Sequence, residues 1–316
     1  MTTETASWPG LSVVVPAYRS PGTLERLCEE LSTHVAPLVE DMEVIFVDDG
    51  SGDGTWSTIQ GLADRFEWVR GLTLLRNYGQ HNAVLVGLRA ARLPLVLTLD
   101  DDLQNPPSQV PLLLEHLSDD RDLVYGTPRE ERQNFLRNAA SKLTKRLMTS
   151  ALGSDVYPRP SAFRVFRREL VMAGDDVRDP YISIDVLMSW ATNRMTDVQV
   201  DFAPRSGGHS GYTLTRLVRH AMNMITGYSA RPLRWVSIFG FITALFGFGL
   251  LVFVLGNFVL RGSPVAGFTF LAAAITLFSG AQLLSLGVVG EYIARIHFRS
   301  MGKPPYVVRA TTDSRP

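Results

Sequence analysis

Three consecutive acidic residues, Asp100, Asp101 and Asp102, directly follow a short apolar run in this chain of 316 residues. Alternate residues of an extended segment point the same way, so the carboxylates of Asp100 and Asp102 can approach one ion. Oxygen ligands of this kind favour Mg²⁺ or Mn²⁺, and magnesium usually takes substrate phosphate oxygens as further ligands. Gln104, two residues on, can orient a metal-bound water or an aspartate. The spacing therefore predicts a metal site at Asp100, Asp102 and Gln104.

The elements before this cluster must position it. Short apolar runs alternate with amphipathic helical patterns, which predicts an α/β fold with a doubly wound, mostly parallel sheet. Helices are expected to begin near Ser20, Thr55 and Gln80. The expected strands are 11–16, 43–47, 72–75 and 95–99.

Polar clusters follow each expected strand. Ligands of such sheets bind beyond the carboxyl ends of the strands, so these clusters should share one edge. The clusters are Pro16-Ala17-Tyr18, Asp48-Asp49, Arg76-Asn77-Tyr78-Gly79 and Asp100-Asp101-Asp102. No G-x-G-x-x-G follows the first strand and no Walker lysine motif is present, which excludes both of these nucleotide-binding signatures. The glycine-rich stretch 50–54 is interpreted as a turn.

Composition excludes other classes of protein. Lys plus Arg and Asp plus Glu number 31 each, so a nucleic acid partner is not expected. The single cysteine, Cys28, excludes an internal disulfide and suits a reducing cytosol. Its place in an amphipathic helical pattern predicts a buried thiol rather than a nucleophile. The short polar N-terminus predicts no signal peptide.

Two long uncharged runs, 235–260 and 268–290, lie near the C-terminus. Each is long enough to cross a ~30 Å hydrocarbon core as a helix, and both are rich in small residues that allow close packing. The alternative is a pair of buried core helices. Arginine and lysine flank the pair on both outer sides, which predicts that both termini and the catalytic domain are cytosolic.

An amphipathic pattern precedes the first run. Apolar residues between Leu214 and Tyr228 form one stripe, with Arg216, Arg219 and His220 opposite. A basic amphipathic helix beside a membrane span is expected to lie in the interface, and a second such segment follows at 291–298. The expected division is a cytosolic α/β domain at 1–210, an amphipathic juxtamembrane helix at 211–234, a transmembrane hairpin of two helices at 235–290, and a cytosolic interfacial helix and tail at 291–316.

Four motifs resemble a known family. VVVPAYRS, VDDGSGDGT, RNYGQHNA and LDDDLQNPP, in this order, are similar to family 2 glycosyltransferases of the GT-A fold. More narrowly, they resemble the polyprenyl-phosphate glycosyltransferases, which include dolichyl-phosphate mannose synthase, undecaprenyl-phosphate glucosyltransferase and undecaprenyl-phosphate 4-deoxy-4-formamido-L-arabinose transferase. The resemblance runs from about Leu11 to Tyr306.

This resemblance implies a function and its partners. One sugar would pass, with inversion, from a nucleotide sugar (a UDP-sugar) to undecaprenyl or decaprenyl phosphate. The location implied is the cytosolic face of a bacterial inner membrane. Mg²⁺ or Mn²⁺ is the implied cofactor, and a homo-oligomer, a tetramer, is the implied assembly.

The resemblance also assigns donor-binding roles. Asp100, Asp102 and Gln104 would surround a metal that bridges the donor diphosphate. Asp48 or Asp49 would bind the base or ribose, the alternative being a turn that these carboxylates cap. A loop that closes over the donor phosphates is matched at 205–212, although Gly211 stands where relatives often have lysine. The expected donor-binding residues are Pro16, Ala17, Tyr18, Asp48, Asp49, Asn77, His81, Asp101, Arg205, Ser210 and Tyr212.

The acceptor phosphate has its own expected residues. Arg129 resembles the family's acceptor-phosphate arginine, and Arg137 with Ser141 resembles a second phosphate grip. Arginine can bind a phosphate through two parallel hydrogen bonds. The alternative for this basic stretch is a solvated helix face.

No general base is evident. Ala162 stands where some relatives carry an aspartate that is assigned as the base. A phosphate acceptor is already largely ionised near neutral pH, so it can attack without a strong base. Asp155 and Asp185 are candidates to orient the acceptor, and the expected catalytic residues are Asp100, Asp102 and Asp185.

Two rival functions fit the sequence less well. A processive polysaccharide synthase needs more membrane helices, and Arg234-Trp235 matches its Q-x-x-R-W element poorly. A non-catalytic nucleotide-binding membrane scaffold would not need the acidic set together with Arg129 and Arg205. The stretches 157–161 and 181–190 are expected to shape the sugar pocket, and the sugar itself is not predicted.

Overall fold

The computed structural model describes residues 8–129, 161–172, 183–203, 231–261, 267–302 and 304–314. The chain divides into two compact units. The first comprises Met1–Thr149, Gly153–Gly211 and Lys303–Pro316, and the second comprises Ser150–Leu152 and Tyr212–Gly302.

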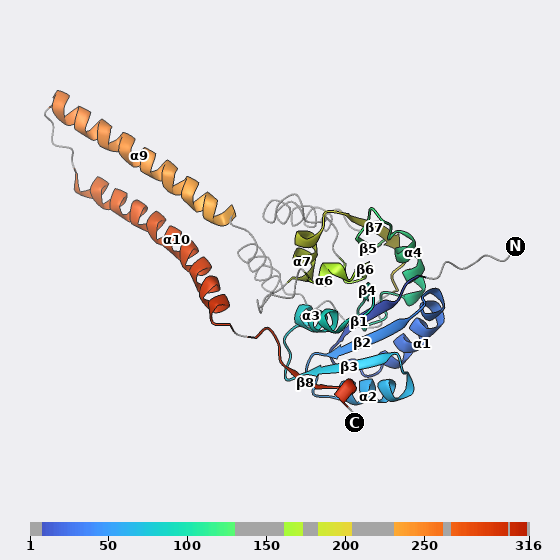
Figure 1. Ribbon diagram of the computed structural model, residues 1–316. Coiled ribbons are helices and arrows are strands. Elements are labelled where there is room, and N and C mark those ends of the chain that lie inside the picture. The colour runs from blue at the N-terminus through green and yellow to red at the C-terminus, as the bar shows by residue number, and fades with distance from the viewer. Residues whose placement is uncertain are drawn as a thin grey trace. The chain divides into compact units, whose positions relative to one another are not determined.

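The first unit is built on one mixed eight-stranded sheet with the order β7-β5-β6-β4-β1-β2-β3-β8 (Figure 1). Strands β1, β2, β3 and β4 run parallel to one another, as do β5 and β7. Strands β6 and β8 are antiparallel to their neighbours. The strands are β1 (Leu11–Ala17), β2 (Met42–Asp48), β3 (Val69–Leu74), β4 (Leu95–Thr98), β5 (Leu123–Pro128), β6 (Arg164–Arg167), β7 (Met195–Val200) and β8 (Val308–Thr311).

Helices cover both faces of this sheet, so the central strands are buried on both sides. In β1, Val13 and Val15 pack with α1, α2 and α4, whereas Val14 packs with α3, α6 and α7 on the opposite face. The α/β expectation is confirmed. The helices are α1 (Leu24–His34), α2 (Thr55–Arg65), α3 (Gln80–Ala90), α4 (Val110–Glu115), α6 (Glu169–Met172) and α7 (Ile184–Ala191), with 3₁₀ turns η1 (Ala36–Leu38), η2 (Pro107–Gln109) and η3 (Thr312–Ser314).

Helix α3 lies unusually close to the sheet. A Cβ at Gly87 would stand 2.3 Å from Val14 Cγ1 of β1 and 3.2 Å from Val47 Cγ2 of β2. Glycine is therefore required at this crossing because any side chain would push the helix away. This close approach packs α3 directly against β1 and β2.

The second unit contains two long helices, α9 (Arg231–Arg261) and α10 (Phe268–Ser300). Within the described residues, one helix meets the length and hydropathy expected of a membrane span: the 22 residues Leu233–Val254 of α9 have a mean hydropathy of 2.3, and none of that stretch is buried. A Cβ at Gly247 of α9 would contact Phe278 of α10 at 3.2 Å, so the small residue allows these helices to approach. The expected pair of spans stays a prediction.

The C-terminus differs from the expected interfacial helix and tail. Helix α10 continues through Gly290 to Ser300 without a break. The residues that follow return to the first unit, where β8 pairs antiparallel with β3 at the edge of the sheet. Local hydropathy did not indicate this strand, because β8 is short and partly exposed and its pairing is with residues more than two hundred positions earlier. Most of the juxtamembrane segment 211–234 lies outside the described residues.

Candidate active site

The three aspartates follow β4 at the carboxyl edge of the sheet, and each has a different partner. Gln80 Nε2, at the start of α3, donates to Asp100 Oδ1 at 2.5 Å. The backbone N–H of Tyr18 donates to Asp101 Oδ2 at 3.2 Å, and the Ser20 hydroxyl donates to the same oxygen. The loops after β1, β3 and β4 therefore meet at these carboxylates.

Gln104 orients Asp102. Its backbone N–H donates to Asp102 Oδ1 at 3.1 Å, and its side-chain amide donates to Oδ2. Leu103, between the two, has a φ of 59°, a left-handed conformation that tightens the turn. Of the two roles considered for Gln104, this geometry matches the one in which the amide orients an aspartate.

The electrostatics of the aspartate cluster suit a cation. Burial raises the pKa of Asp100 to about 6, and repulsion from Asp102 and Asp101 adds to the rise, while Arg164 and Gln80 oppose it. Burial also raises the pKa of Asp101. In the part of the chain that the structure describes, no group of three or more His, Cys, Asp or Glu side chains is arranged to hold a metal ion. A divalent cation at Asp100 and Asp102 would therefore take its other ligands from water or phosphate oxygens.

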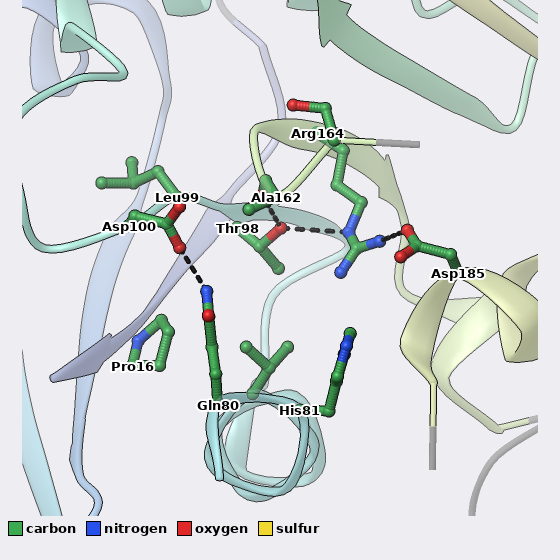
Figure 2. Close-up of a pocket in the computed structure, with 11 residues that line it drawn as sticks. Pro16, Gln80, His81, Thr98, Leu99, Asp100, Ala162, Arg164 and Asp185 are labelled. Atoms are coloured by element: carbon green, nitrogen blue, oxygen red, sulfur yellow. Dashed lines mark hydrogen bonds and ion pairs between the residues drawn. The ribbon is translucent and has the colours of Figure 1, made fainter. Parts of the chain in front are cut away.

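A cavity of about 240 Å³ opens beside Asp100 (Figure 2). Its walls come from the carboxyl ends of β1 and β4, the start of α3, the segment before β6, and α7. The lining residues are Pro16, Gln80, His81, Val84, Thr98, Leu99, Asp100, Ser161, Ala162, Arg164 and Asp185. One stretch expected to shape a sugar pocket thus contributes Ser161, and the other contributes Asp185.

A buried ion pair forms one wall of this cavity. Arg164 Nη1 donates to Asp185 Oδ1, and the side chains are 4% and 23% exposed. Arg164 Nε donates to Thr98 Oγ1 at 3.1 Å, and the Thr98 hydroxyl donates to the Ala162 carbonyl at 2.5 Å (Figure 2). Each residue in this series of hydrogen bonds is held by another, so the wall is rigid.

Asp48 and Asp49 bind neighbouring loops. Asp48 Oδ1 accepts from the Ser51 N–H at 3.0 Å, and Oδ2 accepts from the Thr73 hydroxyl at 2.6 Å. The two oxygens of Asp49 accept from the N–H groups of Tyr78 and Gly79 at 2.7 and 2.8 Å. Both aspartates are 3% exposed. For Asp48, the bond from Ser51 matches the turn-capping alternative. Asp49 instead holds the loop that leads into α3.

The amino-acid sequence has counterparts among known proteins. Residues 12–174 match the family described as Glycosyl transferase family 2. The chain belongs to glycosyl transferase family 2. It is therefore a glycosyltransferase.

Individual relatives extend the match beyond the family region. The chain is similar to undecaprenyl-phosphate 4-deoxy-4-formamido-L-arabinose transferase of Serratia proteamaculans (strain 568), with 33% identity over 97% of this chain and 95% of the relative. The protein of the same name from Klebsiella pneumoniae (strain 342) is 34% identical over 95% of this chain and 92% of the relative. A solved structure of glucosyl-3-phosphoglycerate synthase from Mycobacterium tuberculosis has 23% identity and a TM-score of 0.48, covering 69% of this chain and 76% of that one.

Not every residue predicted to bind the donor of this family 2 glycosyltransferase reaches the cavity. Pro16 and His81 line it. Ala17 is buried and its carbonyl accepts from the Asp49 N–H at 2.9 Å, while Tyr18 and Asn77 are exposed on the adjoining loops. Arg205, Ser210 and Tyr212 lie outside the described residues.

The expected acceptor residues are mostly outside the described chain as well. Arg129 directly follows β5, is exposed, and pairs with Asp201 at 3.2 Å. Arg137, Ser141 and Asp155 lie in the stretch that is not described. Their roles stay predictions.

The sequence reasoning missed three residues of this glycosyltransferase site: Gln80, Thr98 and Arg164. Thr98 lies two positions before Asp100 in an extended strand, so the period of two would have placed them on the same side. Arg164 is a charged residue in an otherwise apolar strand pattern, Phe163–Phe166, and a buried charge needs a partner. Both signals were present in the sequence. Gln80 was recognised only as the start of a helix.

Proposed function

We propose that this chain transfers a single sugar from a nucleotide sugar, a UDP-sugar, to polyprenyl phosphate. The single observation that carries this proposal is the cluster of Asp100 and Asp102 at the edge of a cavity, where Gln80 and Gln104 hold the two carboxylates. The names of the Serratia and Klebsiella relatives support undecaprenyl phosphate as the acceptor.

Asp100 and Asp102 would hold Mg²⁺ or Mn²⁺. When bound, the cation would neutralise charge on the departing diphosphate, which is a large contribution in phosphate chemistry. Gln104 keeps both oxygens of Asp102 in place through its amide and its backbone N–H. Gln80, at the start of α3, holds one oxygen of Asp100, Oδ1. Preorganised ligands of this kind need little rearrangement during the reaction.

The acceptor phosphate would attack directly, with inversion at the anomeric carbon. The site offers no carboxylate at Ala162, and Asp185 is already paired with Arg164. A phosphate monoester carries most of its charge at neutral pH and needs no strong base. Positioning and charge neutralisation are then the main sources of rate.

We also propose that α9 and α10 form a membrane hairpin with the catalytic unit on the cytosolic face. The pairing of β8 with β3 supports this, because the chain leaves the sheet before α9 and rejoins the same sheet after α10. A chain that returns to the side it left must cross the membrane an even number of times. The location would be the inner membrane of a bacterium, with a tetramer as the expected assembly.

The catalytic proposal is tested with the full chain in vesicles that contain undecaprenyl phosphate. A panel of UDP-sugars and GDP-mannose is supplied with Mg²⁺, Mn²⁺ or EDTA, and radiolabelled sugar in the lipid phase is measured. Asp102→Asn should reduce transfer at least about 100-fold, whereas Asp41→Asn, at an exposed position of the same unit, should not change it. Full activity of Asp102→Asn or in EDTA would contradict the metal site, and transfer only to water-soluble acceptors would contradict the lipid acceptor.

The topology is tested by labelling with a membrane-impermeant maleimide. A cysteine at Ser263, between the two helices, should react in intact cells. A cysteine at Asp41 should react only after permeabilisation. Equal labelling of both in intact cells would contradict the hairpin.

A further inference from the structure

The cavity beside Asp100 has the size of one part of a substrate. Its volume is about 240 Å³, below the ~300–1,000 Å³ of pockets that enclose drug-sized ligands. A complete nucleotide sugar would not fit, but a single sugar ring would. Because Asp100 forms part of its wall and also belongs to the proposed diphosphate site, the group in the cavity is the one joined to that diphosphate.

The charges in the cavity suit a neutral ligand with hydroxyl groups. Arg164 is neutralised by Asp185, and Asp100 adds a further carboxylate. A phosphate would meet two carboxylates and an arginine whose charge is already partnered. A hydroxyl can donate to a carboxylate oxygen, and hydrogen bonds to charged acceptors are the stronger kind.

Within the described residues, one carboxylate oxygen of Asp185 has hydrogen-bond donors and the other has none. Oδ1 accepts from Arg164 Nη1 and lies 3.4 Å from the Tyr125 hydroxyl. Among the described residues no donor contacts Oδ2. In Figure 2, Arg164 lies between Thr98 and Asp185, which belongs to the first turn of α7. Asp185 also lies beyond the residues 12–174 that match the family, so the match itself assigns it no role.

We propose that Asp185 is a specificity-determining residue, whose Oδ2 accepts a hydrogen bond from one hydroxyl of the donor sugar. Arg164 is its positioning residue, since it fixes Oδ1 and anchors the pair to β4 through Thr98. This inference rests on the proposed function and replaces the expectation that Asp185 orients the acceptor phosphate. A wall fixed by a buried ion pair selects between sugars because a hydroxyl in another position leaves the carboxylate oxygen unpaired.

The experiment compares Asp185→Asn with the wild type in the vesicle assay. Donors are UDP-glucose, UDP-galactose, UDP-xylose and UDP-N-acetylglucosamine, together with deoxy analogues of whichever the wild type uses best. Asp185→Asn should lower kcat/KM for the best donor about 10- to 100-fold. It should also bring the kcat/KM values of that donor and its epimer closer together. Inhibition by UDP, which lacks the sugar, should stay within about twofold.

The deoxy analogues identify the hydroxyl. With one deoxy analogue, kcat/KM of the wild type should fall to the value that Asp185→Asn has with the complete donor. With that analogue, Asp185→Asn should cause no additional loss of kcat/KM, as expected when both changes remove the same interaction. Asp122→Asn is the matched control, because Asp122 is also held by an arginine, Arg194, but does not line the cavity. Asp185→Glu is the second variant, for use if Asp185→Asn does not fold. It keeps the charge beside Arg164, lengthens the side chain into the cavity, and should also lower kcat/KM for the best donor.

The outcomes separate the two proposals. If the wild type transfers sugar and Asp185→Asn keeps the same donor preference, the assignment of Asp185 is wrong and the proposed function stands. If Asp185→Asn weakens inhibition by UDP as much as it lowers kcat/KM for the UDP-sugar, Asp185 acts on the nucleotide or on the fold, and the assignment is again wrong. If the wild type transfers no sugar to undecaprenyl phosphate from any donor, the proposed function fails first.

Discussion

Asp313, near the C-terminus, is held by Arg70 of β3 across 243 positions of sequence, with Arg70 Nε 3.0 and 2.9 Å from its two carboxylate oxygens. Arg70 Nη1 also donates to Glu43 Oε2 of β2 at 2.8 Å, and Arg92 Nη2 lies 3.2 Å from Asp313. The Arg70 side chain is 15% exposed. This cluster holds the segment after α10 against the catalytic sheet.

Asp313→Asn should therefore loosen the C-terminal strand. The side chain of Asp313 is 36% exposed, so solvent screening reduces the loss to about 1 kcal/mol in the free energy of unfolding. Hydrogen exchange of the β8 amides should increase as well. Asp41→Asn, which removes an exposed carboxylate elsewhere on the same unit, should leave both measurements unchanged.

The same pair gives a pH dependence with a definite sign. Hydrogen bonds from Arg70 hold the pKa of Asp313 below its usual value. Such a carboxyl stabilises the fold above the unfolded-state pKa of ~3.9 and loses that contribution as the pH falls toward the folded-state value. The stability difference between the wild type and Asp313→Asn should be constant near neutral pH and shrink below about pH 4. A difference that grows on acidification would count against this pairing.

Gly87 and Gly61 form a matched pair of helical glycines with opposite expectations. A Cβ at Gly87 would collide with Val14 at 2.3 Å, so Gly87→Ala should destabilise the catalytic unit by about 1–3 kcal/mol despite the better helix propensity of alanine. Nothing lies within 4 Å of a Cβ at Gly61, so Gly61→Ala should stabilise it by up to about 1 kcal/mol. Chemical denaturation measures both. Gly87→Ala should also lower transfer activity, because α3 carries Gln80.

Gln80→Leu tests the support of Asp100 directly. The substitution removes the hydrogen bond to Asp100 Oδ1 and keeps the approximate size of the side chain. A hydrogen bond to a charged group contributes ~1.5–3 kcal/mol, so kcat/KM should fall about 10- to 100-fold, with a higher metal concentration needed for half-maximal rate. Gln60→Leu on α2, which packs on the other face of the sheet, should retain wild-type values. An unchanged metal requirement in Gln80→Leu would show that this bond does not support the site.

Cys28 provides a probe of unfolding. It is fully buried in α1, and burial raises the pKa of its thiol to about 12. Thiol reagents attack the thiolate, so the native chain should not react at pH 8, whereas the denatured chain should react at one site. The expectation of a buried core thiol is confirmed by its position. Rapid labelling under native conditions would indicate that α1 opens locally.

Residues 11–99 show how far local pattern carries a prediction. The four expected strands agree with β1 to β4 to within three residues at each end, because apolar runs between turn residues are a strong signal. Strands β5, β6, β7 and β8 were not predicted. Each joins the sheet through a partner far away in sequence, and β6 carries Arg164 in place of a clean apolar pattern.

The site was likewise predicted only where its signal is local in the sequence. Asp100 and Asp102 were found because their spacing is local. The sequence does not decide between ligand binding and turn capping for Asp48 and Asp49, because some of their partners lie elsewhere in the chain: Thr73 in β3 and Gly79 in the loop before α3. Asp185 was among the expected residues, but its ion pair with Arg164 was not predicted, because the two residues meet only after β6 has paired with β4.

The position of β8 after α9 and α10 sets the order in which the sheet can be completed. Strands β1 to β4 leave the ribosome early, yet the edge of β3 stays open until residues 308–311 have been synthesised. An unpaired edge is a template for wrong pairing. Both long helices are translated before that edge is covered, so the catalytic sheet reaches its final form only after α9 and α10 have emerged. Completion of the enzyme thus follows synthesis of its hydrophobic helices and cannot precede it.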